Sequence, residues 1–198
     1  MKKVMISTIY KGKVVKAAIT KLSPIKLVLL IDKPIEKTKK AAVDYLKQHF
    51  RDVIQIETLA TSVYEMPKII SDVVKKIDEE AKQENEIIVH VSEGRKITSL
   101  ALLFAAYLRK DKIKGAYYII EETNEVLTLP LINFSLGGSK KKLLQEVEKG
   151  NGKIEKLLKK LQIKQSAIYQ HIQELKKEGY LESNKEFKLT DLGRIMIL

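Results

Sequence analysis

The chain has 198 residues, in which 37 Lys and Arg stand against 25 Asp and Glu, so the formal net charge is +12. The hydrophobic content of 44% is enough for a folded core and excludes a disordered basic tail. A surplus of this size favours a polyanionic partner, because lysines that neutralise phosphates release condensed counterions. The alternative is that a Lys-rich surface reflects only a thermophilic composition.

The lack of cysteine excludes disulfides, cysteine-based zinc sites and cysteine nucleophiles, and it fits an intracellular protein. The N-terminus has no long apolar stretch of the signal-peptide type. The longest apolar run, residues 27–31, is far too short to span a bilayer. We therefore expect a soluble, cytoplasmic protein without a membrane partner.

Short apolar runs alternate with longer helical patterns over the first 130 residues. The predicted strands are residues 4–9, 26–31, 53–56, 87–91 and 116–120, and the predicted helices are residues 14–22, 36–50, 64–82 and 97–110. This alternation predicts an α/β, Rossmann-like fold, with a mostly parallel sheet and helices on both faces. The connection at 121–125 is too short for a crossover, so residues 126–129 should form an antiparallel edge strand.

The pattern lapses from residue 131 to 138, where two consecutive glycines indicate a hinge. We place the domain boundary there, with a large domain at 1–136 and a small one at 137–198. Residues 139–198 hold 14 Lys and Arg and 8 Asp and Glu, so their surplus of six equals that of the 138 residues before them. Positive charge is therefore denser in the small domain.

Three helical patterns follow the hinge, at residues 140–148, 153–161 and 165–178, with a tight turn at 162–164. The third helix has one apolar face, and its other face carries side chains suited to base edges and phosphates. These are Gln165, Ser166, Tyr169, Gln170, Gln173, Lys176 and Lys177. Gly179 ends this helix, and residues 180–182 and 187–189 form a β-hairpin with Lys185 near its tip. A last helix begins after Thr190.

The stretches SAIYQHIQELKKEGYLES and FKLTDLGR resemble the winged helix-turn-helix domains of bacterial and archaeal transcription regulators. The resemblance covers about 60 residues and includes their spacing. It implies binding to double-stranded DNA, with the third helix in the major groove. A winged helix used only for dimerisation or protein contact is the alternative.

A ligand of a doubly wound sheet binds where the strand order reverses, here between the first and fourth strands. The sequence has neither GxGxxG nor GxxxxGK[ST], so an ordinary dinucleotide site and a P-loop are not expected. Residues 92–98 follow the fourth strand and run into a helix. Ser92 and Thr98 offer hydroxyls, Gly94 allows close approach, and Arg95 and Lys96 add charge at a positive helix end. They predict a phosphate cradle, although an ordinary strand-to-helix turn with a chance basic pair is the alternative.

This segment resembles the motif of CARF domains, the Rossmann-like sensors of CRISPR systems. The large domain and the winged helix together are similar to CRISPR-associated transcription regulators. The resemblance implies a homodimer that binds one cyclic oligoadenylate, typically cyclic tetra-adenylate, across its two-fold axis. Carried over, the ligand contacts are Thr8, Tyr10, Ser92, Gly94, Arg95 and Lys96. Thr98 is a further expected ligand contact, because of its hydroxyl in the predicted phosphate cradle. Glu93 stands where the family usually has glycine, and we expect its charge to oppose a phosphate.

The three histidines have no partner at metal-ligand spacing, so no metal and no cofactor are expected. His49 is placed on the apolar side of its helix, His90 inside a strand, and His171 near the DNA-reading helix. The main prediction is a ligand-responsive transcription regulator without enzymatic activity. Two alternatives stay open: a metal-independent ring nuclease, in which Ser92 and Lys96 orient the attacking 2′-hydroxyl, and a ligand-independent DNA-binding protein.

Overall fold

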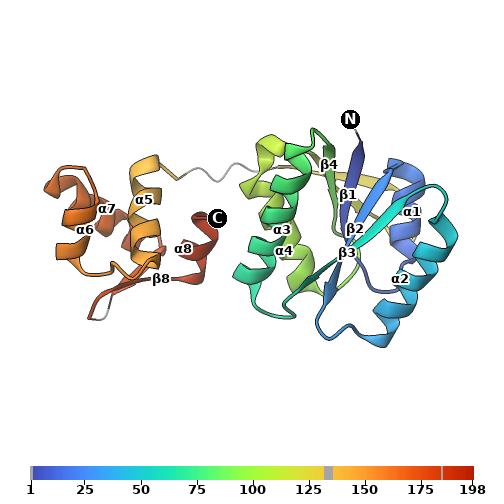
Figure 1. The fold of residues 1–198 in the computed structure, drawn as a ribbon, viewed down its shortest axis with the longest axis horizontal. Helices are drawn as coiled ribbons and strands as arrows, with labels where there is room; N and C mark the ends of the chain where they lie inside the picture. The colour runs from blue at the N-terminus through green and yellow to red at the C-terminus, as the bar shows by residue number, and fades with distance from the viewer. Residues whose placement is uncertain (1, 132–135, 184) are drawn as a thin grey trace. The chain divides into compact units, whose positions relative to one another are not determined.

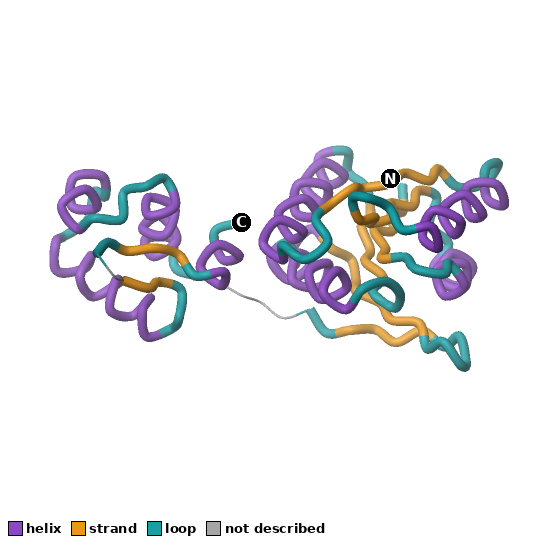
Figure 2. Tube along the Cα trace, turned by 90° about the horizontal axis from the view of Figure 1, so that it is seen from below, coloured by secondary structure: helices purple, strands orange, loops and turns teal. Residues whose placement is uncertain are grey.

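The computed structural model describes residues 2–131, 136–183 and 185–198. Its internal contacts divide the chain into two compact units, Met1–Asn133 and Phe134–Leu198, which are visible in Figures 1 and 2. The division falls a few residues before the predicted boundary. The predicted hinge at 131–138 lies partly outside the described residues.

The first unit is built on a six-stranded sheet in the order β3-β2-β1-β4-β5-β6. The strands are β1 (Lys3–Thr8), β2 (Lys26–Asp32), β3 (Gln55–Thr61), β4 (Glu86–His90), β5 (Ile113–Ile119) and β6 (Val126–Leu129). The first five are parallel, and β6 pairs antiparallel with β5, as its short connection predicts. The order reverses between β1 and β4, and the two lie side by side.

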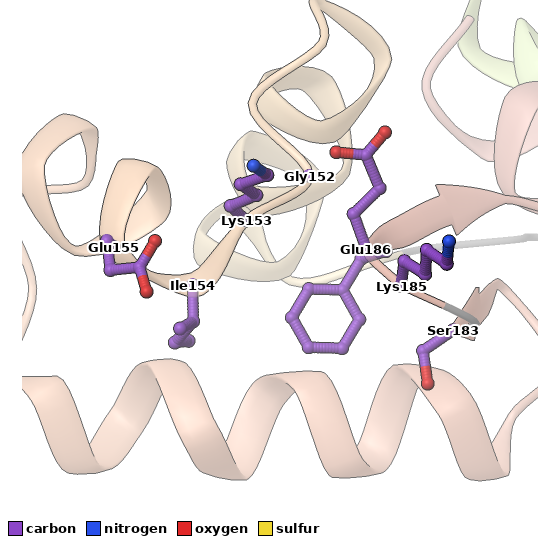
Figure 3. A pocket seen from close by; sticks show the side chains of 8 residues that line it. Gly152, Lys153, Ile154, Glu155, Ser183, Lys185 and Glu186 are labelled. Carbon is purple, nitrogen blue, oxygen red and sulfur yellow. The ribbon is translucent and has the colours of Figure 1, made fainter.

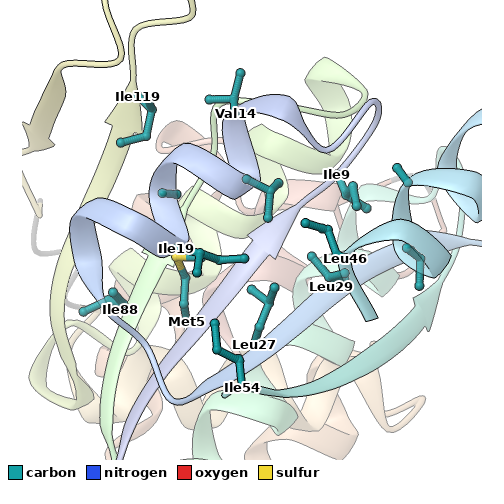
Figure 4. Close-up of a cluster of buried hydrophobic side chains, with 14 residues drawn as sticks. Met5, Ile9, Val14, Ile19, Leu27, Leu29, Leu46, Ile54, Ile88 and Ile119 are labelled. Atoms are coloured by element: carbon teal, nitrogen blue, oxygen red, sulfur yellow. The ribbon is translucent and has the colours of Figure 1, made fainter. Parts of the chain in front are cut away.

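Helices cover both faces of this sheet (Figure 1). They are α1 (Lys13–Leu22), α2 (Lys37–Phe50), α3 (Met66–Lys82) and α4 (Lys96–Leu108), with a short 3₁₀ turn η1 (Lys110–Lys112) after α4. Figure 4 shows the core beneath α1 and α2, where Met5, Leu27 and Leu29 of the strands meet Ile19 and Leu46. The next residues along β1 and β2 face α3 and α4 and are buried as well, which explains the unbroken apolar runs of these strands.

The third strand is the main correction to the expected elements of this unit. The sequence predicts it at 53–56, but it runs over Gln55–Thr61, and Val53 is 74% exposed outside it. β3 is an edge strand with the sequence QIETLAT, and most of its residues are exposed or half-buried. An edge strand needs no continuous apolar run, so the short run before it is a misleading signal.

The second unit contains α5 (Gly138–Glu148), α6 (Ile154–Lys160), α7 (Gln165–Lys177), β7 (Leu181–Ser183), β8 (Phe187–Leu189) and α8 (Asp191–Met196). The first three helices begin and end within two residues of their predicted bounds. Ile168, Ile172 and Leu175 of α7 pack on Leu143 and Leu157 in one core. β7 and β8 form an antiparallel hairpin, and Thr190 caps α8 by accepting a hydrogen bond from the Gly193 backbone.

Among the described residues, no helix combines the length and the apolar character needed to cross a membrane.

Candidate functional site

The β1–α1 loop and the β4–α4 turn meet at the carboxyl edge of the sheet, because β1 and β4 are adjacent and parallel. Gly94 has a φ of +92°, a conformation that favours glycine. A Cβ atom there would lie 3.2 Å from the Thr8 Cβ and 3.3 Å from the Ile9 carbonyl oxygen. The structure therefore brings Gly94 and Thr8, two of the predicted ligand contacts, against each other at the point where the strand order reverses.

Glu93 binds the β1–α1 loop, which corrects the expectation that its charge is directed at a ligand. Its carboxylate accepts backbone hydrogen bonds from Tyr10 at 3.0 Å, Gly12 at 2.8 Å and Val14 at 2.8 Å. The Gly12 and Val14 amides belong to the start of α1, where a negative charge is favourable, and the Tyr10 amide belongs to the loop before it. Glu93 thus occupies an anion site formed by the backbone of its own chain, where three N–H groups solvate its carboxylate.

Arg95 lies along the carboxyl edge toward β2 and β3. Its Nε donates to Asp32 Oδ2 at 3.2 Å, its Nη2 lies 3.7 Å from Glu36 Oε2, and its guanidinium lies 5.6 Å from the Tyr64 ring centroid. Asp32 also pairs with Lys39, which is buried, at 2.6 Å. A ligand phosphate would therefore compete with two carboxylates for Arg95.

Sequence reasoning missed both Asp32 and Tyr64 as neighbours of this site. A usable signal existed for Asp32, because it is the one charged residue that closes the apolar run of β2, at the edge where ligands bind. Tyr64 offers no comparable signal, since its place beside Arg95 depends on the three-dimensional path of the β3–α3 loop.

The other predicted ligand contacts differ in their exposure and in their hydrogen-bond partners. Lys96, the first residue of α4, is exposed, and so is Tyr10. The Ser92 Oγ accepts a hydrogen bond from the Ile119 backbone nitrogen at 2.6 Å, so it fastens the turn to β5. Thr8 and Thr98 are 1% and 2% exposed, and within the described residues neither Oγ1 has a hydrogen-bond partner. Two unpaired buried hydroxyls beside one turn are a feature that calls for a role.

His90 is fully buried, as expected for a strand position. Its Nδ1 lies 2.8 Å from the Ser7 Oγ, which itself donates to the Thr8 carbonyl oxygen. We therefore assign the proton to Nδ1, which leaves the buried Nε2 as a bare acceptor without a partner among the described residues. Burial lowers the pKa of His90 to about 4, so this ring is neutral at physiological pH.

The two other histidines lie away from this edge. His49 is exposed and stacks on Tyr45 with ring centroids 3.9 Å apart, so its predicted place on the apolar side of α2 is wrong. The helix turns this side chain outward because Val43 and Leu46 already fill the buried face. His171 is half-buried on α7, 3.8 Å from Glu174. Over the described ranges, no group of three or more His, Asp or Glu side chains could hold a metal ion.

The outer face of α7 carries all seven side chains that the sequence singles out, and all seven are exposed. Ile168, Ile172 and Leu175 are buried on the opposite face. Lys176 donates to the Ser183 Oγ at 3.1 Å and so joins α7 to the hairpin. Lys185, also exposed, lines a pocket of about 430 Å³ that Lys153 borders from the start of α6 (Figure 3). The second unit thus presents one exposed helix face with lysines on the neighbouring elements.

Solved structures share the fold at low sequence identity. One is a type III CRISPR defence DNA nuclease activated by cyclic oligoadenylate, 12% identical, covering 76% of this chain and 27% of that chain, with a TM-score of 0.54. The second, Csm6 of Enterococcus italicus bound to cyclic hexa-2′-fluoro-hexa-dAMP, is 13% identical and covers 90% of this chain and 55% of that chain at a TM-score of 0.54. The third, the protein VC1899 from Vibrio cholerae, is 8% identical and covers 98% and 63% at a TM-score of 0.54.

The chain spans between about a quarter and two thirds of the length of these three proteins. No curated protein matches it. The first unit defines a Rossmann-like α/β domain with a turn at the strand-order reversal. Residues 5–124 match the family model described as HFX_2341_N:-like, N-terminal. The chain belongs to this family.

Proposed function

We propose that this chain is a ligand-responsive DNA-binding regulator of a CRISPR system. In this proposal its first unit is a CARF domain that senses cyclic oligoadenylate, most simply cyclic tetra-adenylate. Its second unit is a winged helix-turn-helix that binds promoter DNA. The observation that carries the proposal is the place of the β4–α4 turn, where Arg95 and Lys96 stand at the positive end of α4 beside the strand-order reversal.

The ligand part rests on charge and on two structural neighbours. One neighbour is activated by cyclic oligoadenylate, and Csm6 is bound to a cyclic hexanucleotide. Lys96 is exposed and can bind a phosphate directly, whereas Arg95 is hydrogen-bonded to Asp32 at the carboxyl edge of the sheet. The unpaired, buried hydroxyls of Thr8 and Thr98 lie beside the same turn.

The DNA part rests on the second unit. A tight turn joins α6 and α7, and α7 exposes Gln170, Gln173 and Lys177 opposite its buried face. Gln is suited to adenine edges and Lys to guanine edges or phosphates. A hairpin with Lys185 follows α7, as a wing follows the recognition helix.

A homodimer is part of this proposal. One winged helix covers one half-site, so regulation of a symmetric operator needs two copies. Leu100 lies one turn after Lys96 on α4, and its apolar side chain is 51% exposed. It therefore marks an exposed apolar surface on α4. We assign this surface to a second copy of the chain, which would place two β4–α4 turns around one cyclic ligand.

Titration calorimetry with cyclic tri-, tetra- and hexa-adenylate tests the sensor, and gel shifts on promoter fragments with and without the ligand test the regulator. Heat with one of the three rings and a ligand-dependent change in DNA affinity are expected. Heat without any DNA binding at low salt would reject the regulator and keep the sensor. Loss of labelled ligand over time would favour the ring nuclease, and DNA binding that ignores every ligand would favour the ligand-independent binder.

A further inference from the structure

A pocket of about 540 Å³ lies where β3 ends and α3 begins, beside the proposed phosphate-binding turn but apart from it. This volume is typical of small-molecule sites. The lining residues come from the β2–α2 loop, β3, the β3–α3 loop and the first turns of α3. They are Lys33, Ala60, Thr61, Ser62, Val63, Tyr64, Glu65, Lys68 and Asp72.

Tyr64 is the exposed aromatic residue of this pocket. Its side chain is 71% exposed, so packing does not account for an aromatic ring here. The loop that carries it is ordered by two hydrogen bonds of Ser62, whose Oγ accepts from the Glu65 backbone nitrogen and donates to the Glu65 carboxylate, each at 3.2 Å. Arg95 engages one side of this residue, with its guanidinium 5.6 Å from the ring centroid and its Nη1 donating to the Tyr64 hydroxyl at 3.4 Å. The rest of the ring offers a platform on which a planar base can stack.

The polar groups of the pocket suit the edge of a base. Thr61 Oγ1 donates to Asp72 Oδ2 at 2.9 Å, and Lys68 Nζ lies 3.7 Å from the same oxygen. Both of these contacts are made by Oδ2, so we expect Oδ1 to accept from an exocyclic amino group. Aromatic stacking together with a carboxylate acceptor is the chemistry of an aminopurine site.

Arg95 connects this pocket to the turn. It starts in the β4–α4 turn, passes the carboxyl end of β1, binds Asp32 at the end of β2 and reaches Tyr64 after β3. Neighbouring strands lie about 4.8 Å apart, so the backbone of the turn after β4 is roughly 10–14 Å from the backbone of the β3–α3 loop, and the Arg95 side chain bridges part of that distance. A single phosphate does not span that distance, whereas a phosphate and a base of one oligonucleotide ring do.

We infer that this pocket binds an adenine base of the effector, with Tyr64 as its stacking platform and Asp72 as the acceptor for the amino group. The inference rests on the proposed sensor function, because that function supplies the adenine. In this inference the pocket contacts a base of the same ligand whose phosphate the β4–α4 turn contacts.

The test compares three variants by calorimetry with cyclic tetra-adenylate. Tyr64→Ala should weaken binding roughly 5- to 150-fold, the range that base–aromatic stacking contributes. Tyr64→Phe keeps the ring and should stay within about threefold of the wild type. Tyr45→Ala is the matched control, because Tyr45 is another exposed tyrosine of the same unit, on α2. It should bind as the wild type does.

The outcomes separate this inference from the sensor proposal. Wild-type affinity in Tyr64→Ala would overturn the base site and leave the sensor intact. If the wild type binds no cyclic oligoadenylate, the sensor proposal fails, and adenosine and guanosine monophosphates are titrated instead. Binding of the adenosine nucleotide that Tyr64→Ala removes would then still support the base site. Equal binding of both nucleotides, or of neither, would overturn it.

Discussion

The Glu93 carboxylate accepts a hydrogen bond from the Gly12 backbone nitrogen at 2.8 Å, which ties the β4–α4 turn to the first turn of α1. The two residues are 81 positions apart in the chain and meet only because β1 and β4 are neighbours. The Glu93 carboxylate therefore occupies the N-terminal end of α1. Because the carboxylate is bound by three backbone donors, we expect Glu93 to support the turn more than it opposes a ligand.

Glu93→Gly should lower the free energy of unfolding by about 2 kcal/mol, because three backbone donors at the start of α1 lose their acceptor. Glu93→Gln keeps one acceptor oxygen and should lose about half as much. Urea denaturation followed by circular dichroism measures both. Glu122→Gln, in the exposed turn before β6, is the control and should be neutral. Tighter binding of cyclic tetra-adenylate by a stable Glu93→Gly variant would contradict this account.

The stability of the first unit should fall as the pH drops from about 6.5 to about 4. Burial lowers the pKa of His90 to about 4 from an ordinary value of 6.5, so in this window the unfolded chain takes up a proton that the folded chain does not. The stabilisation is fully present above the ordinary value and amounts to about 3 kcal/mol at most.

His90→Asn, which keeps a polar group near Ser7, should remove that part of the pH dependence. Unfolding midpoints in urea at pH 7.5, 6, 5 and 4 measure the difference between the two proteins. Parallel pH profiles of wild type and variant would show that His90 does not titrate in this way.

Lys96→Ala should weaken cyclic tetra-adenylate binding roughly tenfold or more, since a charge-assisted contact contributes about 1.5–3 kcal/mol. Arg95→Ala should also weaken binding, and the double variant should abolish it. The fold should survive, because Lys39 still pairs with Asp32 once Arg95 is gone. Lys114→Ala, on β5, is the control. Unchanged calorimetric affinity in the double variant would remove the β4–α4 turn from the site.

Gln173→Ala should relax sequence preference on DNA by about 1–3 kcal/mol for the lost base contact. Gln170→Ala should do the same, although Gln170 Nε2 donates to Glu174 at 2.9 Å and must give up that bond to reach a base. Competition gel shifts with point-substituted operators measure the preference. Gln48→Ala, on α2 of the other unit, is the control. A uniform loss on all sequences would instead assign these side chains to the phosphate backbone.

Lys185→Ala should weaken binding to all DNA sequences about equally and flatten the slope of log affinity against log salt by about one unit. Lys185 is exposed on the hairpin, where a wing contacts phosphates. Titrations at four salt concentrations give the slope, with Lys47→Ala of α2 as the control. An unchanged slope would place the hairpin away from DNA.

Local pattern was enough for most of the elements. Ile87, Ile88 and Val89 are apolar in succession because β4 is covered on both faces. Such a run predicts a buried parallel strand. The stripe from Ile69 to Ile77 likewise predicts α3, whose five apolar members are buried. A strand or helix with a solvent-facing side gives a weaker signal, which explains why the predicted position of β3 and the predicted side of α2 for His49 are wrong.

The sequence likewise predicts some features of the candidate site and not others. The residue types of the β4–α4 turn, and its position after the fourth strand, could be predicted because they are contiguous in the chain. The partners of Glu93 and Arg95 could not, because Gly12, Asp32 and Tyr64 come from other loops that only the strand order brings to one edge. A charged side chain takes whichever partner its neighbours in space provide, so its role at this edge is decided by the tertiary structure and not by the motif that contains it.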